Sequence, residues 1–212
     1  MEATVEIPLF PLNVVLFPGM PLPLHIFEER YKQMIGDCLT SRNPFGVLLA
    51  TQTQLANVGC TAAITQIIQR YADGRLDILT EGRRRFRVLD YHQRKPYLEG
   101  AIEYFDDEEE DVPNELLERA IAFYQEMTEL ATKGLGRAQG IFDPVQFSFM
   151  IASTVDRGLE EKQTLLEFTS TTERLLKLIV ALEQSLERLR LDRQLEQAAK
   201  RNGRVQQKSR DE

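Results

Sequence analysis

The sequence predicts an α+β fold in which a β-rich part precedes a helical part. Residues 4–105 contain short apolar segments rich in branched residues and interrupted by proline and glycine, as strands are. From residue 114 onward apolar residues recur at spacings of four and three, which is the period of a helix. Six consecutive acids at 106–111 separate the two patterns. We therefore predict domains at 1–112 and 113–199 and a disordered polar tail at 200–212.

The opening segment, residues 7–31, combines large apolar side chains with five prolines: Pro8, Pro11, Pro18, Pro21 and Pro23. Each proline lacks a backbone N–H and fixes φ, so neither an ordinary helix nor a central strand can run through the whole segment. We predict a first strand, a crossing loop and a second strand. The spacing of Tyr31, Met34, Ile35, Cys38 and Leu39 then predicts an amphipathic helix over 28–39.

Short strands are predicted through the rest of the β-rich part. Residues 45–50 form an apolar run, and Asp73-Gly74 joins the segments 61–71 and 75–80 as a hairpin. Glu81-Gly82 is expected to break the chain before further strands at 84–91 and 97–105. Several short strands with little helix between them are typical of a small barrel or a strongly bent sheet.

Helical seams mark the second part. One seam is formed by Leu116, Ala120, Phe123, Met127 and Leu130, and Gly134 and Gly136 are expected to end its helix. Asp143 and Pro144 are typical of a helix start, and a short helix is expected around 160–168. The capping box Ser170–Glu173 opens the longest helix, whose seam is Leu175, Ile179, Leu182, Leu186 and Leu189.

Two seams of similar length predict that these helices pack as a bundle. A second stripe on the longest helix consists of Leu178, Leu191 and Leu195. This stripe would suit self-association as a homodimer.

Composition narrows the class of protein. Apolar residues make up 42% and charged residues 28% of the chain, as in an ordinary soluble globular protein. A net charge of −7 argues against nucleic-acid and anionic-membrane partners. The acidic start lacks the long apolar run of a signal peptide, and Cys38 and Cys60 fit a reducing compartment. These features predict a cytoplasmic protein.

Six motifs in the first half resemble the N-terminal domain of Lon proteases, which is the substrate-binding domain of those ATP-dependent proteases. They are P-L-F-P-L-N-V-V-L-F-P-G at 8–19, P-L-H-I-F-E-E-R-Y at 23–31, F-G-V-L-L at 45–49, G-C-T-A-A-I at 59–64, L-T-E-G-R-R-R-F-R-V-L at 79–89 and P-Y-L-E-G-A-I-E at 96–103. The likeness spans roughly residues 5–190. It implies an N-terminal PUA-like small β-barrel with one or two helices, followed by a C-terminal helical bundle.

No chemistry-bearing module of those proteases is predicted here. The chain contains no G-x-x-x-x-G-K-[ST] phosphate loop, its cysteines and histidines lack metal-ligand spacing, and His25 stands without an assignable nucleophile. We expect no catalytic residue, no cofactor and no metal.

The resemblance implies a free-standing, non-catalytic domain that recognises unfolded or tagged polypeptides or docks a protease or chaperone partner. Two other functions stay open at this point, a Lon-like ATP-dependent peptidase component and an RNA-binding PUA-like protein.

Candidate polypeptide-binding residues come from two groups. Phe10, Phe17 and Phe27 either fill the core or form an exposed apolar patch. Arg85 and Arg87 share one face of a strand because side chains alternate. They either bind a partner or form structural ion pairs with nearby acids, among which are Glu81, Asp90 and the 106–111 run.

Overall fold

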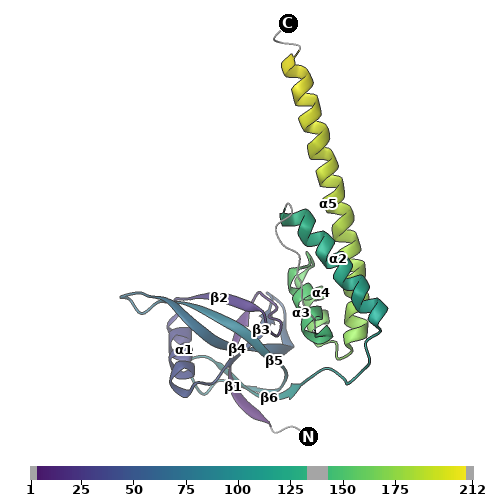
Figure 1. Cartoon of the computed structure of the whole chain (residues 1–212). Helices are drawn as coiled ribbons and strands as arrows, with labels where there is room; N and C mark the ends of the chain where they lie inside the picture. The colour runs from purple at the N-terminus through teal and green to yellow at the C-terminus, as the bar shows by residue number, and fades with distance from the viewer. Residues whose placement is uncertain (1–3, 133–142, 209–212) are drawn as a thin grey trace.

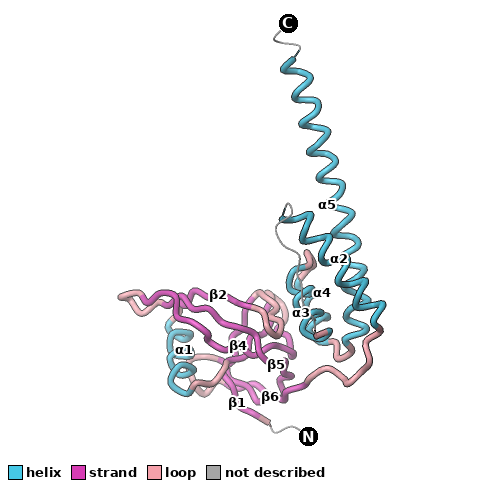
Figure 2. The backbone as a smooth tube through the Cα atoms, viewed as in Figure 1, coloured by secondary structure: helices cyan, strands magenta, loops and turns pink. Residues whose placement is uncertain are grey.

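Figure 1 shows a computed structural model of the chain, which describes residues 4–132 and 143–208. The strands and one helix form the first part, and four helices form the second (Figures 1 and 2). The strands are β1 (Val5–Leu12), β2 (Pro21–Ile26), β3 (Phe45–Ala50), β4 (Leu55–Arg70), β5 (Leu76–His92) and β6 (Leu98–Phe105). The helices are α1 (Glu29–Ser41), α2 (Asn114–Thr132), α3 (Pro144–Thr154), α4 (Leu159–Glu167) and α5 (Thr171–Lys208).

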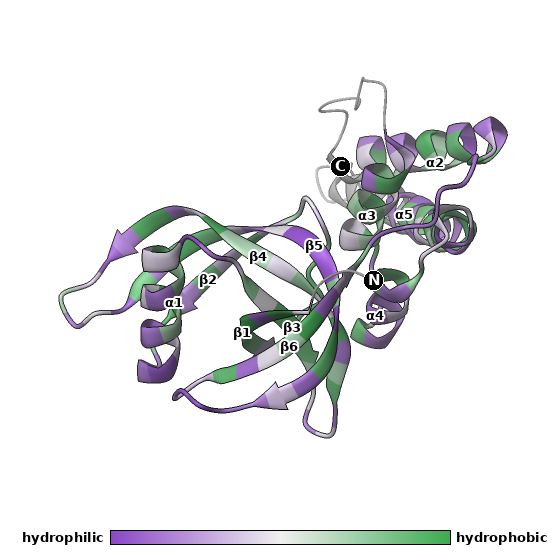
Figure 3. Ribbon diagram, turned by 90° about the horizontal axis from the view of Figure 1, so that it is seen from below, coloured by the Kyte–Doolittle hydropathy of each residue, from purple (hydrophilic) through white to green (hydrophobic). Residues whose placement is uncertain are grey.

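The six strands form one strongly curved sheet, with the order β2-β5-β4-β3-β1-β6. Strand β6 pairs with both β1 and β5, so the ladder β5-β4-β3-β1-β6 closes on itself. Figure 3 shows these strands wrapped around a common interior, with α1 beside them. The pair β1–β3 is parallel and the other ladders are antiparallel. The α+β class is confirmed, and the PUA-like assignment stays a prediction.

Strand β5 runs without interruption through Gly82, where we expected a break. The backbone of Gly82 instead bonds to the crossing loop, donating to Met20 O at 2.9 Å and accepting from Gly19 N at 2.8 Å. A Cβ at Gly82 would lie 2.2 Å from Phe17 O. The glycine therefore allows the loop to approach the strand closely and does not end the strand.

The predicted helix starts in the second part are confirmed. The Asp143 carboxylate accepts from Gln146 N at 2.9 Å, and Ser170 Oγ accepts from Glu173 N at 3.1 Å. The seam of α5 is buried from Leu175 to Leu186, and its members up to Leu182 share a buried cluster with residues of α3 and α4. Gly134 and Gly136 lie outside the described residues.

Helix α5 continues to Lys208, where we expected a disordered tail from residue 200. Lysine, arginine and glutamine predominate over 200–208, and these straight-chain residues have good helix propensity, so a polar composition does not prevent a helix. Figure 1 shows α5 extending well past the end of α2. In the described ranges every helix is either too short or too polar to serve as a membrane span.

The two parts share a hydrophobic core. Phe17, Leu49 and Val58 from the β-rich part belong to the same buried cluster as Phe149 and Leu166 from the helices. A second cluster lies between the sheet and α1, and a third lies between β1, β5 and β6. The junction near residue 112 is therefore a packed interface.

Candidate functional site

The three candidate phenylalanines do not form a common surface patch. Phe10 is 5% exposed and its ring centroid lies 4.1 Å from that of Tyr31. Phe17 is 1% exposed and packs on Phe149, with the ring centroids 6.2 Å apart. Phe27 is 59% exposed. Phe10 and Phe17 therefore belong to the core, and only Phe27 is open to a ligand.

Arg85 and Arg87 share a face, since both guanidinium groups lie over the ring of Phe105, at 4.5 and 5.0 Å from its centroid. Their exposure differs greatly. Arg85 is 3% exposed and donates to the carbonyls of Leu166 and Phe168 at 3.0 and 2.5 Å. Burial lowers the pKa of Arg85. A ligand can reach Arg87 but not Arg85, which connects the sheet to the helices.

The Asp107 carboxylate pairs with Arg85 inside a buried cluster of side chains. We call this cluster the joint; its members are Arg85, Asp107, Ser148, Thr171 and Arg174. The Asp107 carboxylate is 4% exposed and also pairs with Arg174, which is 0% exposed. Arg174 donates further to Ser148 Oγ at 2.8 Å and Thr171 Oγ1 at 3.1 Å. Two arginines thus share one carboxylate, and neutral oxygens accept further N–H groups of both.

The acidic run 106–111 is mostly exposed, but three of its acids bond to residues around the start of α5. Besides Asp107, Glu108 accepts from Thr169 Oγ1 at 2.8 Å and Glu110 accepts from Thr172 N at 2.8 Å. The hydrogen bond from the backbone N–H of Thr172 lowers the pKa of the Glu110 carboxyl group. These acids lie against the start of α5, where a helix dipole favours negative charge. The run therefore holds the segment that links the two parts against the start of α5.

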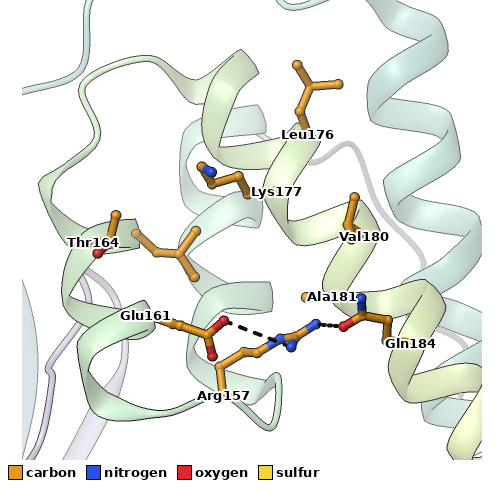
Figure 4. A pocket seen from close by; sticks show the side chains of 9 residues that line it. Arg157, Glu161, Thr164, Leu176, Lys177, Val180, Ala181 and Gln184 are labelled. Atoms are coloured by element: carbon orange, nitrogen blue, oxygen red, sulfur yellow. Dashed lines mark hydrogen bonds and ion pairs between the residues drawn. The ribbon is translucent and has the colours of Figure 1, made fainter.

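An open groove between α4 and α5 is a candidate site. It has a volume of about 470 Å³ and is lined by Arg157, Glu161, Thr164, Leu165, Leu176, Lys177, Val180, Ala181 and Gln184. Figure 4 shows side chains from α4, from α5 and from the residues before α4, with Arg157 between Glu161 and Gln184. Leu176 and Val180, one helical turn apart on α5, are 52% and 51% exposed.

A polar rim surrounds the apolar floor of this α4–α5 groove. Arg157 donates to the Gln184 side chain and lies 4.0 Å from the Glu161 carboxylate. The Lys177 amine lies 5.8 Å from the ring centroid of Phe168. An open, half-apolar groove with a few polar groups can hold apolar side chains of a ligand and orient their backbone.

The described residues present no catalytic constellation. Burial raises the pKa of the Cys38 thiol to about 11 and that of Cys60 to about 12, so neither is an activated nucleophile. His25 Nδ1 lies 2.5 Å from Asp77, whose other oxygen accepts from Tyr71 at 2.7 Å. Within residues 4–132 and 143–208, no serine or cysteine forms a hydrogen bond with this trio. Within those ranges no three potential metal ligands gather either.

Sequence reasoning missed Arg174, Leu176 and Val180. Arg174 lies one residue before the α5 seam, and its sequence position does not distinguish it from the charged residues of an ordinary helix surface. Leu176 and Val180 are spaced by four but lie off that seam, so they indicate a second apolar face of α5. That spacing is the signal that could have revealed the groove.

Comparison with known proteins gives a consistent result. A family model described as the ATP-dependent protease La (LON) substrate-binding domain matches residues 6–184. Lon protease 1 of Hydrogenovibrio crunogenus is 30% identical over 205 residues, which is 89% of this chain and 25% of that protein. Lon protease of Anaeromyxobacter dehalogenans is 28% identical over 210 residues, 92% of this chain and 25% of that protein. The chain thus spans about a quarter of the length of these curated relatives.

Two solved structures share the fold. A Lon N-terminal domain protein from Xanthomonas campestris superposes with a TM-score of 0.68 at 24% identity, covering 83% of this chain and 98% of that one. The N-terminal domain of the Mycobacterium avium complex Lon protease gives a TM-score of 0.65 at 18% identity, covering 84% and 98%. At these identities the likeness is one of fold.

Proposed function

The chain belongs to the LON substrate-binding domain family, and from this membership we propose that it binds unfolded or tagged polypeptides without catalysing a reaction. The family match covers the substrate-binding domain alone. The raised pKa values of the two thiols agree with a binding role, because neither thiol forms a thiolate readily. ATP-dependent cleavage by this chain is not part of the proposal.

The α4–α5 groove is our candidate for the polypeptide site. The observation that carries this choice is the pair Leu176 and Val180, both half exposed on the floor of a groove with a polar rim. Covering such side chains with an apolar segment of a ligand removes hydrocarbon surface from water. A folded protein hides its apolar residues, so the groove would select unfolded segments.

The rim would supply orientation more than affinity. Arg157, Lys177 and Gln184 can donate hydrogen bonds to the carbonyl groups of an extended or helical segment. Glu161 can accept from its amide groups. A groove of this kind recognises apolar side chains at regular spacing without reading one sequence, which suits a protein that handles many clients.

A double variant tests the assignment. We expect Leu176→Asp with Val180→Asp to weaken binding of a fluorescein-labelled, permanently unfolded model protein at least about tenfold, as measured by fluorescence anisotropy. The control is Leu89→Asp, because Leu89 is 53% exposed on β5 but does not line the groove. The assignment fails if the double variant binds as tightly as the unmodified chain, or if the control loses affinity equally.

We assign the closed strand ladder to the PUA-like barrel that the family resemblance implies. Helices α2–α5 are assigned to a helical bundle. The functional boundary between barrel and bundle lies near residue 112. A protease or chaperone partner would dock on a surface distinct from the groove. Exposed Leu191 and Leu195 on α5 are the candidate contacts for a homodimer.

A further inference from the structure

We propose that a second cleft, between the β3–β4 turn and α4, binds the guanidinium group of an arginine side chain in a polypeptide. This cleft is separate from the α4–α5 groove, and the proposal does not depend on that groove. Three observations carry it, namely a buried acceptor without a partner, the charges of the lining residues and the apolar residues beside them.

The cleft lies where the two parts of the molecule meet. It has a volume of about 350 Å³, and its lining residues come from the β3–β4 turn and from α4: Leu49, Thr51, Gln54, Leu55, Ala56, Glu160, Gln163 and Glu167. Residues 160, 163 and 167 recur at spacings of three and four, so they form one face of α4. Glu161, the next residue along, lines the α4–α5 groove instead.

Gln163 supplies the unpartnered acceptor. Its side-chain Nε2 donates to Val58 O at 3.0 Å and to the Glu167 carboxylate at 2.8 Å, which fixes the orientation of the amide. The residue is 9% exposed, and its Oε1 is buried without a hydrogen-bond partner among the described residues. Leaving a buried hydrogen-bond acceptor without a donor costs folding free energy. A ligand that brings an N–H donor would satisfy it.

The charges of the cleft specify the kind of donor. Its lining includes the exposed carboxylates of Glu160 and Glu167 and no basic residue. Lys162, a basic residue of α4, is held elsewhere, since its amine donates to Ser153 O at 3.1 Å. A cation is therefore favoured over a neutral amide.

The geometry favours guanidinium over ammonium. A guanidinium group carries five N–H donors in one plane, and the cleft offers three acceptor groups, Gln163 Oε1 and the two carboxylates. Leu49, Leu55 and Ala56 provide an apolar wall along which the three methylene groups of an arginine can lie. Leu55 is 37% exposed, so part of that wall is uncovered in the free protein.

The test uses the full chain and short blocked peptides. We expect acetyl-Ala-Arg-Ala-amide to shift the side-chain NH₂ signals of Gln163 in ¹H–¹⁵N spectra. The same peptide with citrulline, which keeps the shape but loses the charge, should bind at least about fivefold more weakly. Glu160→Gln should weaken binding of the arginine peptide about fivefold, while Glu118→Gln, which removes an exposed acid of α2 that lines neither the cleft nor the groove, should leave it unchanged.

Each remaining outcome would overturn the proposal. Equal binding of the arginine and citrulline peptides would show that the positive charge of the guanidinium group does not contribute to binding. Equal losses in Glu160→Gln and Glu118→Gln would mean general attraction to a chain of net charge −7. Binding of agmatine without binding of the blocked peptide would make the ligand a free small amine. Since the double variant of the α4–α5 groove leaves this cleft intact, failure of one site is distinguishable from failure of the other.

Discussion

The guanidinium of Arg174 and the carboxylate of Asp107 form an ion pair that is closed off from solvent, with the two side chains 0% and 4% exposed. The pair joins the first turn of α5 to the segment that leaves β6. Because Arg85 of β5 shares the same carboxylate, one acid fixes both parts of the molecule. The position of the helices relative to the sheet therefore depends on Asp107.

Asp107→Ala should be strongly destabilising. It leaves two buried arginines without their carboxylate, and breaking a buried ion pair typically costs about 3–5 kcal/mol. The matched control is Asp106→Ala, which removes an exposed pair with Arg84 and should cost at most about 1 kcal/mol. Urea unfolding followed by circular dichroism measures both, since the chain has no tryptophan. Similar losses in the two variants would contradict the role of the joint.

Gly82→Ala should lower the melting temperature, because a Cβ would lie 2.2 Å from Phe17 O and the crossing loop would have to move. Gly36→Ala serves as the control. Apart from its chain neighbours and the backbone of α1 itself, no heavy atom lies within 4 Å of a Cβ at Gly36, so alanine should stabilise the helix by up to about 1 kcal/mol. If Gly82→Ala melted at or above the temperature of the unmodified chain, the close approach would be wrong.

The two cysteines should resist thiol reagents in the folded protein. Burial raises their pKa values to about 11 and about 12, so few thiolates exist near pH 8 and the sulfur atoms are covered. We expect labelling by a disulfide reagent to be slow in buffer and to reach two thiols per chain in urea. Rapid labelling of the folded chain would contradict the burial of both thiols.

Glu110 should make stability depend on pH. Its pKa is lowered in the folded state by the Thr172 amide, so its contribution is present above the ordinary glutamate pKa of 4.5 and is lost as pH falls below that value. Glu110→Gln should therefore lower the melting temperature at neutral pH and have less effect near pH 3. Glu109→Gln is the control. An effect of Glu110→Gln that did not change with pH would count against this bond.

Local patterns sufficed for much of the fold. The strand at Phe45–Ala50, the Asp73-Gly74 turn and the Asp143 cap depend on nearby residues, and each was predictable from sequence. Gly82 was misread because its role depends on a loop residue far from it in sequence, Phe17. Whether Phe10, Phe17 and Phe27 are buried likewise depends on packing partners that alternation alone does not specify.

The site was less predictable than the fold. The sequence does not reveal that Asp107 of the acidic run meets Arg174, whose partners come from distant segments. The α4–α5 groove is open because no described segment fully covers Leu176 and Val180. The local sequence does not reveal which apolar residues stay uncovered in the fold. Only the spacing of these two residues was visible.

The central claim is that the α4–α5 groove holds unfolded polypeptide, and a methyl NMR titration of the full chain with an unfolded model protein tests it most directly. The account predicts that the methyl signals of Leu176 and Val180 shift first and to the greatest extent, while Ile68 near the β4–β5 turn, 54% exposed, stays unchanged. Shifts at Ile68 with none at Leu176 or Val180 would contradict it.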